Sequence, residues 1–349
     1  MACALGPRLP AWQARLAFVR PRLIVDGMDE AHEQHDVVVV GGGAAGLGGA
    51  LTLARARRSV LVIDAGEQRN RPASGVHGFL TRDGLPPAEL VALGRAEVER
   101  YGGTVLDGRV AALAGSAGAF AVTLDDGRAF GARRLLVTTG LVDELPEVPG
   151  LRELWGTDVV HCPYCHGYEV RDEPIGVLST GPLSLHQAQL FRQWSGDVTL
   201  FLHTGPRPSE EEAEALAARG IAVVEGEVAA LETEAGRLRG VRLASGEVVP
   251  RRVLAVATTL VARAELLAGI GLHATEHELG VGQRIEADGT GRTAVPGVWV
   301  AGNVTDLMAW VAGAASAGAL AGAAINNDLV AEDTRVAVER TAAVRAAAA

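Results

Sequence analysis

A glycine-rich turn between two apolar segments constrains this chain more than any other feature. Val37 to Val40 is a continuous apolar run, Gly41-Gly42-Gly43-Ala44-Ala45-Gly46 follows it, and residues 47–56 are mostly small and apolar. This pattern predicts a strand, a tight turn and a helix, in which the glycines let a pyrophosphate approach the helix N-terminus. A glycine motif alone is weak evidence in a chain with 44 glycines. The flanking segments therefore decide its meaning.

The next predicted strand ends in an acid at the expected distance. Residues 59–63 form an apolar run that ends at Asp64. Asp64 lies 18 residues after Gly46, close to the ~20 residues typical of the acid that binds a ribose hydroxyl. Strand, turn, helix and acid together predict a Rossmann-type unit that binds a dinucleotide. Its candidate contacts are Gly41, Gly43, Ala44, Ala45, Gly46, Asp64 and Ala65.

A second unit with the same layout begins near Pro174. Residues 175–178 predict a strand, 185–194 a helix and 198–202 the following strand. The turn between them reads Ser-Thr-Gly-Pro-Leu-Ser over residues 179–184, so only one glycine remains in it. Beyond this unit, a helix is predicted over 210–219 and strands over 221–224 and 253–257.

Two of the three cysteines stand in the segment Cys162-Pro163-Tyr164-Cys165-His166. A close pair in a chain with few cysteines is more often catalytic or metal-binding than part of a disulfide framework. The residue types fit three chemistries: a dithiol that exchanges electrons with a bound dinucleotide, a c-type haem attachment, or a zinc site that includes His161. Haem attachment requires export, and four zinc ligands within six residues would be strained. We therefore favour the redox dithiol and expect no metal.

The bulk properties exclude several classes of protein. With 349 residues, of which 48% are hydrophobic, the chain is long enough for two domains. A net charge of -10 gives no basic surface for nucleic acid, and no apolar run reaches the ~18 residues of a membrane helix. Residues 1–34 show neither the glycine pattern nor a signal-peptide core. We expect a disordered N-terminal extension and a cytoplasmic protein.

The chain closes with another strand and turn. Residues 297–301 predict a strand that runs into Gly302-Asn303. A helix rich in Ala and Gly is predicted from about Trp310 to Leu329, and its small residues allow a neighbour or a ligand to come close. Residues 331–349 are expected to form a frayed tail.

In this order, the segments over about residues 35–330 resemble the low-molecular-weight thioredoxin reductase family. Gly41 to Gly46 looks like the family's FAD pyrophosphate loop, Thr138-Thr139-Gly140 like its Ala-Thr-Gly turn, and Gly302-Asn303 like its second FAD motif, normally Gly-Asp. The second motif favours FAD over NAD at the first loop. The resemblance thus implies FAD, with further contacts from Thr139, Gly140, Gly302, Asn303, Trp310 and Val311.

The resemblance also implies an architecture and a set of catalytic roles. The expected fold is α/β, with two Rossmann-type dinucleotide-binding domains and the second inserted into the first. Residues 35–144 and 258–330 would form the FAD domain and 145–257 the inserted NAD(P)-type domain, in a homodimer. Cys165 would face the flavin and Cys162 would exchange with the substrate. His166 replaces the family's acid/base Asp, and imidazole can move the thiol proton near neutral pH.

The second unit departs from the family pattern. The family's Gly-x-Gly-x-x-Ala falls on Ser179, Gly181 and Ser184, and Pro182 removes one backbone N–H from the turn. The His-Arg-Arg that grips the NADPH 2′-phosphate falls on residues 202–204, which read Leu-His-Thr and contain no arginine. NAD(P)H is therefore a doubtful cofactor for this chain.

Cys162 to Glu169 also resembles a subset of the family, the gliotoxin and holomycin dithiol oxidases, which oxidise dithiols of natural products with dioxygen. His77-Gly78-Phe79-Leu80 resembles another segment of that subset. We therefore expect an FAD-dependent oxidase of a small-molecule dithiol, with O2 as acceptor. Two alternatives stay open: an NAD(P)H-dependent reductase of a thioredoxin-like protein, and a non-catalytic flavin-bound redox sensor.

Overall fold

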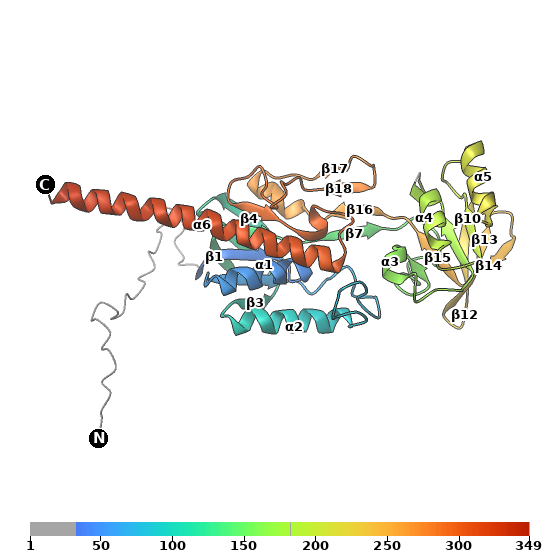
Figure 1. Cartoon of the computed structure of the whole chain (residues 1–349), viewed down its shortest axis with the longest axis horizontal. Helices are drawn as coiled ribbons and strands as arrows, with labels where there is room; N and C mark the ends of the chain where they lie inside the picture. The colour runs from blue at the N-terminus through green and yellow to red at the C-terminus, as the bar shows by residue number, and fades with distance from the viewer. Residues whose placement is uncertain (1–32, 182, 349) are drawn as a thin grey trace, which may run out of the picture. The chain divides into compact units, whose positions relative to one another are not determined.

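The glycine-rich turn belongs to a seven-stranded sheet. A computed structural model describes residues 33–181 and 183–348, so most of the predicted extension, and Pro182, lie outside the described residues. The strands follow the order β3-β2-β1-β6-β5-β4, with β19 beside β6 (Figure 1). The parallel strands are β1 (Glu33–Val40), β2 (Val60–Asp64), β3 (Thr104–Asp107), β6 (Ala129–Val137) and β19 (Val298–Val300). β5 (Ala119–Leu124) pairs antiparallel with β6, and β4 (Val110–Ser116) pairs antiparallel with β5 at the edge of the sheet.

The apolar runs of the sequence form the centre of this sheet. Val37 to Val40 and all of β2 are buried, as expected for parallel strands that are covered on both faces. β1 begins four residues before the predicted run because Glu33 to His35 also pair with β6. The helices of this unit include α1 (Ala44–Arg55), which follows the turn as predicted, and α2 (Pro87–Arg100).

The small residues of the last helix bring it against α1. α6 (Val311–Ala347) lies beside α1 in Figure 1. A Cβ atom at Gly318 would overlap the carbonyl oxygen of Ala45, and one at Gly322 would lie 2.7 Å from the carbonyl oxygen of Gly49. The two backbones therefore touch, and the predicted close approach is confirmed with α1 as the neighbour.

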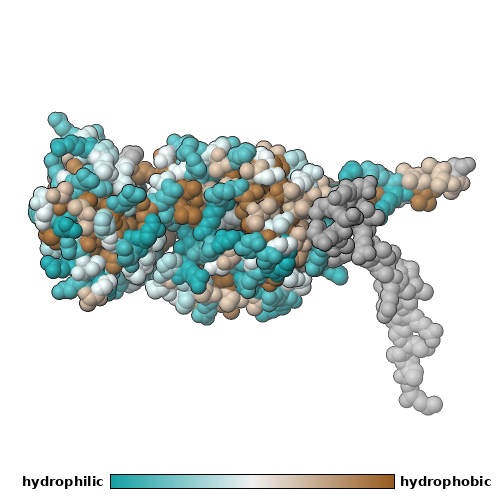
Figure 2. Space-filling model, turned by 180° about the vertical axis from the view of Figure 1, so that it is seen from behind, coloured by the Kyte–Doolittle hydropathy of each residue, from teal (hydrophilic) through white to brown (hydrophobic). Residues whose placement is uncertain are grey.

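The predicted end of this helix is wrong. α6 does not stop near Leu329 and fray, but continues to Ala347. No Gly or Pro follows Gly322 in the helix, and alanine has the highest helix propensity. Arg133 and Arg134 on β6 also form ion pairs with Asp333 and Glu332, which fixes the middle of the helix. The final turns are exposed, and Figure 2 colours them tan to brown, as their Ala and Val content dictates.

A five-stranded parallel sheet forms the second unit, in the order β11-β10-β9-β15-β8. Its strands are β8 (Val159–Val160), β9 (Ile175–Leu178), β10 (Val198–Phe201), β11 (Ile221–Val224) and β15 (Val253–Val256). Its helices are α3 (Pro163–His166), which contains Cys165 and begins directly after Cys162, α4 (Leu183–Phe191) and α5 (Glu210–Ala218). A three-stranded antiparallel sheet of β12 (Val228–Glu234), β13 (Arg237–Leu243) and β14 (Val248–Pro250) accompanies it.

Two paired strands carry the chain between the units. β7 (Leu141–Glu144) leads out of the first unit and β16 (Thr259–Ala262) leads back, and the two pair antiparallel. β17 (Thr275–Glu276) and β18 (Gly282–Arg284) complete this four-stranded sheet. The expected α/β fold with two Rossmann-type units, one inserted in the other, is confirmed. The bounds of the two domains, 35–144 with 258–330 for the first and 145–257 for the inserted one, stay a prediction.

Candidate active site

A cavity of about 1120 Å³ reaches from the glycine-rich turn to the cysteine pair. It is lined by residues of both units, and every predicted site residue except Gly46 contributes to the lining. These residues are Gly41, Gly43, Ala44, Ala45, Asp64, Ala65, Thr139, Gly140, Cys162, Cys165, His166, Gly302, Asn303, Trp310 and Val311.

Gly46 does not line the cavity but packs against the backbone of Gly41 and the side chain of Thr138. A Cβ atom there would overlap the carbonyl oxygen of Gly41 and lie 2.7 Å from Oγ1 of Thr138. Gly41 has φ of +106°, which glycine adopts without strain. Gly43 is different, since a Cβ atom there would meet no protein atom within 4 Å. The turn therefore has no space for a side chain at Gly46, whereas at Gly43 it is open toward the cavity.

The predicted ribose-binding acid is buried and partly neutralised. Asp64 accepts a hydrogen bond from the backbone N–H of Gly66 at 3.1 Å and forms an ion pair with Arg95 at 2.7 Å. Gly42 makes room for it, because a Cβ atom at Gly42 would lie 2.6 Å from the Asp64 carboxyl carbon. The sequence placed Asp64 correctly at the end of β2 but gave no sign of Arg95, which comes from α2.

Two turns of the first unit, Thr139-Gly140 and Gly302-Asn303, also line the cavity. The Thr139 hydroxyl donates to the carbonyl oxygen of Arg263 at 2.7 Å, which ties the outgoing chain to the returning chain. Asn303 uses its Nδ2 to donate to carbonyl oxygens of Asp306 and Ala309, each at 3.0 Å. Its Oδ1 receives no hydrogen bond from the described residues. An Asn at this position thus orders the following loop and keeps one acceptor for a ligand hydroxyl.

The two cysteines form a hydrogen-bonded dithiol. Their Sγ atoms lie 2.9 Å apart, with Cys165 donating to Cys162. This hydrogen bond, and backbone N–H groups of Cys165 and Tyr164, lower the pKa of the Cys162 thiol to about 7. The shared proton, together with burial, raises the pKa of Cys165. Cys162 is therefore the more acidic sulfur of the pair and the better leaving group.

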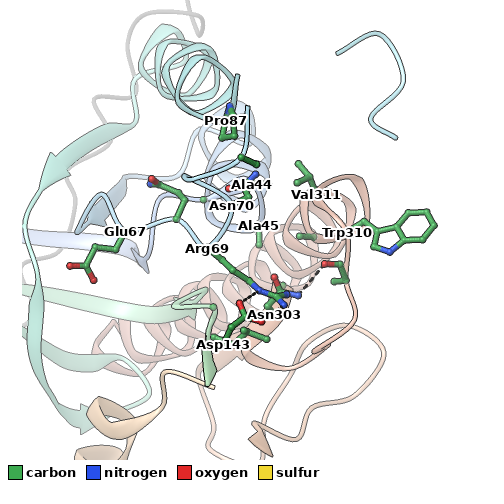
Figure 3. Close-up of a pocket in the computed structure, with 18 of the residues that line it drawn as sticks. Ala44, Ala45, Glu67, Arg69, Asn70, Pro87, Asp143, Asn303, Trp310 and Val311 are labelled. Atoms are coloured by element: carbon green, nitrogen blue, oxygen red, sulfur yellow. Dashed lines mark hydrogen bonds and ion pairs between the residues drawn. The ribbon is translucent and has the colours of Figure 1, made fainter. Parts of the chain in front are cut away.

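An ion pair that sequence reasoning missed lies near the cysteines. Arg69 donates to both carboxylate oxygens of Asp143 on β7, whose side chain is 6% exposed and also accepts from the Thr258 hydroxyl at 2.8 Å (Figure 3). The guanidinium charge contributes to lowering the pKa values of Cys162 and of the neighbouring His161. No motif marks Arg69 or Asp143 in the sequence, so no local signal announces the pair.

The proposed acid/base histidine lies directly after the cysteine pair on α3. Burial lowers the pKa of His166, and its Nδ1 is buried with no hydrogen-bond partner among the described residues. His77 comes from the predicted His-Gly-Phe-Leu segment, and its Nε2 lies 3.5 Å from Glu169. This contact joins a loop of the first unit to the segment after α3. The structure therefore brings both predicted histidines to the cysteine end of the cavity.

The second dinucleotide turn keeps one open glycine, because a Cβ atom at Gly181 would meet no protein atom within 4 Å, but its serines make internal contacts. Ser179 is fully buried, and its hydroxyl occupies the space where a Cβ atom of Gly205 would lie. The backbone N–H of Thr180, a group that such turns offer to phosphate, donates to the Ser184 hydroxyl at 3.2 Å. His203 accepts from the backbone N–H of Val228 at 3.0 Å, so this side chain faces the protein.

The family of this chain follows from its sequence match. Residues 35–319 match the model for the pyridine nucleotide-disulphide oxidoreductases. The chain belongs to this family. Members of the family bind FAD, and the open glycine at Gly43, the buried acid at Asp64 and the free Oδ1 of Asn303 fit that cofactor.

Curated relatives match about half of the chain. Thioredoxin reductase tcpT of Claviceps purpurea (strain 20.1) is 38% identical over 175 residues, which is 48% of this chain and 54% of that protein. Thioredoxin reductase aclD of Aspergillus oryzae (strain ATCC 42149 / RIB 40) is 34% identical over 178 residues, which is 48% of this chain and 56% of that protein. The chain thus spans about half the length of the curated relatives it matches.

Solved structures match over more of the chain. The crystal structure of HlmI has a TM-score of 0.82 and 46% identity, and the match covers 88% of this chain and 96% of HlmI. An oxidoreductase from Agrobacterium tumefaciens has a TM-score of 0.80 and 38% identity, covering 85% of this chain and 99% of that protein. These matches confirm the thioredoxin reductase-like fold.

Within the described residues, no three or more His, Cys, Asp or Glu side chains are grouped so as to hold a metal ion. In the same part of the chain, no helix is both long and apolar enough to cross a bilayer.

Proposed function

We propose that the protein is an FAD-dependent dithiol oxidase that converts a small-molecule dithiol to its disulfide and reduces O2 to hydrogen peroxide. One observation carries the direction of electron flow. The Cys162–Cys165 pair opens on the cavity, whereas in the second dinucleotide turn the Thr180 backbone N–H is already bonded to Ser184 and Ser179 stands where the family has its first glycine. A nicotinamide cofactor would have to compete with Ser184 for this N–H, while a dithiol meets an accessible redox pair.

FAD would be held by the first unit. Gly41, Gly43 and the N-terminus of α1 are suited to its pyrophosphate, Asp64 to a ribose hydroxyl and Asn303 Oδ1 to a ribityl hydroxyl. Bound FAD supplies a two-electron acceptor that reoxidises the cysteines and then reduces O2. All of these residues line the same cavity as the cysteine pair.

The cysteines and one histidine perform the exchange with substrate. A substrate thiolate attacks the Cys162–Cys165 disulfide at Cys162, which forms a mixed disulfide and releases the Cys165 thiolate. The second substrate thiolate then displaces Cys162, whose lowered pKa makes it a good leaving group. The substrate loses two electrons and two protons, and the enzyme gains a dithiol. Burial keeps His166 neutral near pH 7, so it can accept a thiol proton.

A reductase that runs in the opposite direction is the second candidate function. Its support is that tcpT and aclD both carry the name thioredoxin reductase. In that case NAD(P)H would reduce the flavin and then a thioredoxin-like protein. A flavin-bound sensor would undergo the same cysteine chemistry without turnover. For each reading we propose a homodimer.

Anaerobic flavin bleaching separates these functions. We expect dithiothreitol to bleach the flavin absorbance, and air to restore it with one peroxide per disulfide formed. NADPH and NADH, added in parallel at the same concentration, should leave the flavin oxidised. Rapid bleaching by micromolar NADPH would identify a reductase. Bleaching by dithiothreitol without repeated turnover in air would identify a sensor.

A further inference from the structure

The side-chain amide of Asn303 fastens the loop that follows it. Its Nδ2 donates to the backbone carbonyl oxygens of Asp306 and Ala309, each at 3.0 Å, and to that of Leu307 at 3.3 Å. Three carbonyl oxygens around one end of the side chain can only be met by its NH2 group, which fixes the orientation of the amide. Asn303 therefore ties loop 304–310 to the turn that resembles the second FAD motif.

The centre of loop 304–310 packs on the two strands that connect the units. Leu307 is buried and forms a small apolar cluster with Leu141 of β7 and Leu260 of β16. β7 leads into the inserted unit and β16 leads back from it. The loop is thus held by Asn303 on one side and by the connecting strands on the other.

The end of loop 304–310 contacts the cysteine segment. Ala309, which accepts from Asn303, precedes Trp310, and the Trp310 ring centroid lies 5.3 Å from that of Tyr164. Tyr164 stands between the two cysteines in the sequence. On another side, Trp194 meets the Tyr164 ring edge-on at 5.7 Å. A chain of direct contacts therefore runs from Asn303, along the loop, to the residue between the two sulfurs.

From these contacts we infer that Asn303 is a positioning residue that sets the placement of the cysteine segment through loop 304–310. It would act through Trp310 and Tyr164, so the rate at which the dithiol reduces the flavin would depend on the Asn303 amide. An Asp, the residue normal in the family, would remove both N–H donors and set a carboxylate against three carbonyl oxygens. The inference rests on the exchange between cysteines and flavin in the proposed function, but on neither the identity of the thiol nor that of the final acceptor.

Hydrogen–deuterium exchange of the FAD-loaded protein tests the placement without turnover. We expect Asn303→Asp to speed exchange about fivefold in loop 304–310 and in residues 162–168, a factor typical of the loss of one hydrogen bond. Within 162–168, the reporting amides are those that bond inside α3. An effect in both segments would show that the Asn303 amide acts beyond its own loop.

Two further variants locate the effect along the chain of contacts. Trp310→Leu breaks only the last contact, so it should speed exchange in 162–168 and leave the hydrogen-bonded amides at the start of loop 304–310 protected. Asn326→Asp is the matched control, because Oδ1 of Asn326 already accepts from Nε of Arg58 at 2.8 Å. The control should change exchange in neither segment.

Anaerobic stopped-flow reduction by dithiothreitol measures the effect on the reaction, per bound flavin. We expect Asn303→Asp to lower the limiting rate constant of flavin bleaching about tenfold, since a displacement of about 1 Å at a reacting centre can cost up to ~100-fold. The effect of Trp310→Leu should not add to it, because both substitutions break the same chain of contacts. Asn326→Asp should bleach at the rate of the wild type.

The outcomes separate this inference from the proposed function. If dithiothreitol does not bleach the wild-type flavin, the proposed function fails, and the exchange data still decide the inference. If Asn303→Asp loosens only loop 304–310, or if the two substitutions have additive effects on the rate constant, the inference is wrong and the proposed function stands. If Asn303→Asp yields no folded protein, Trp310→Leu decides, since unchanged exchange in 162–168 would overturn the inference and faster exchange there would support it.

Discussion

Arg69 binds Asp143 through two parallel hydrogen bonds, from Nε to Oδ2 at 2.6 Å and from Nη2 to Oδ1 at 2.7 Å. The pair joins the loop after β2 to β7, the strand that leads into the inserted unit. Asp143 is nearly inaccessible to solvent, so its negative charge depends on this partner. The ion pair is therefore both a structural link and a source of positive potential beside the cysteines.

Removing one member of this pair should destabilise the protein. We expect Arg69→Gln to lower the free energy of unfolding by about 3 kcal/mol, because it leaves a buried carboxylate without its counter-ion. Arg207→Gln, which breaks an exposed pair with Glu225, should cost less than about 1 kcal/mol. Urea denaturation of both variants tests this. Equal losses would show that the Asp143 charge is solvated in some other way.

The same substitution should change the reactivity of Cys162. Since the Arg69 charge contributes to lowering the pKa of this thiol to about 7, its removal should raise that pKa. The pH dependence of iodoacetamide alkylation in the reduced protein measures it. A midpoint that stays in place would mean that the hydrogen bonds from Cys165 and from the local backbone set the pKa without Arg69.

Alanine substitutions at Gly46 and Gly43 should have different effects, the first on folding and the second on flavin binding. Gly46→Ala forces a methyl group into the Gly41 carbonyl and should yield little folded protein. Gly43→Ala meets no protein atom, so it should keep its circular dichroism spectrum and melting transition but lose flavin. Flavin absorbance per chain, measured beside the melting curve, distinguishes the two effects. Full flavin content in Gly43→Ala would place the pyrophosphate elsewhere.

The two cysteines should differ in their optical signatures. Cys162→Ser removes the thiol whose shared proton is the largest cause of the raised pKa of Cys165, so we expect Cys165 to ionise beside the flavin and to produce a long-wavelength charge-transfer band, whereas Cys165→Ser should not. Visible spectra of the two purified variants, recorded from pH 6 to 9, give the answer. The reverse pattern would exchange the roles of the two sulfurs.

Stability should fall as the solution is acidified below pH 6.5. Burial lowers the pKa values of His161, His166 and His203 in the folded state. The unfolded chain, with histidine pKa values near ~6.5, therefore binds more protons than the folded one as pH drops, and the free energy of unfolding decreases. This contribution is fully present above about pH 6.5. Denaturation midpoints between pH 7.5 and 5 test it, and a constant midpoint would contradict it.

The sequence was informative wherever a function depends on consecutive residues. The turn from Gly41 to Gly46 and the acid at Asp64 belong to one strand–turn–helix–strand unit, so spacing alone located them. The cysteine pair is equally local. The end of α6 was missed because a run of alanines carries no stop signal, and its ion pairs to β6 come from residues about 200 positions away.

Long-range pairs had no signal that a single sequence can provide. Arg69 and Asp143 are 74 positions apart. The chain has 32 arginines, so residue type alone does not indicate which of them pairs with Asp143. The ring contact between Tyr164 and Trp310 joins residues 146 positions apart, one from each unit. The resemblance implied only a cofactor contact for Trp310, and nothing in the sequence pointed to its contact with Tyr164.

The buried Ser179 hydroxyl, set against Gly205, also bears on cellular chemistry. An oxidase that does not bind NAD(P)H at the second dinucleotide turn would be insulated from the ratio of reduced to oxidised nicotinamide. The redox state of its cysteines would then follow the thiol that it meets and the oxygen around it. Its product would stay oxidised under reducing metabolism, for as long as no other reductant acts on it. With oxygen as the final acceptor, the proposed exchange would run in one direction.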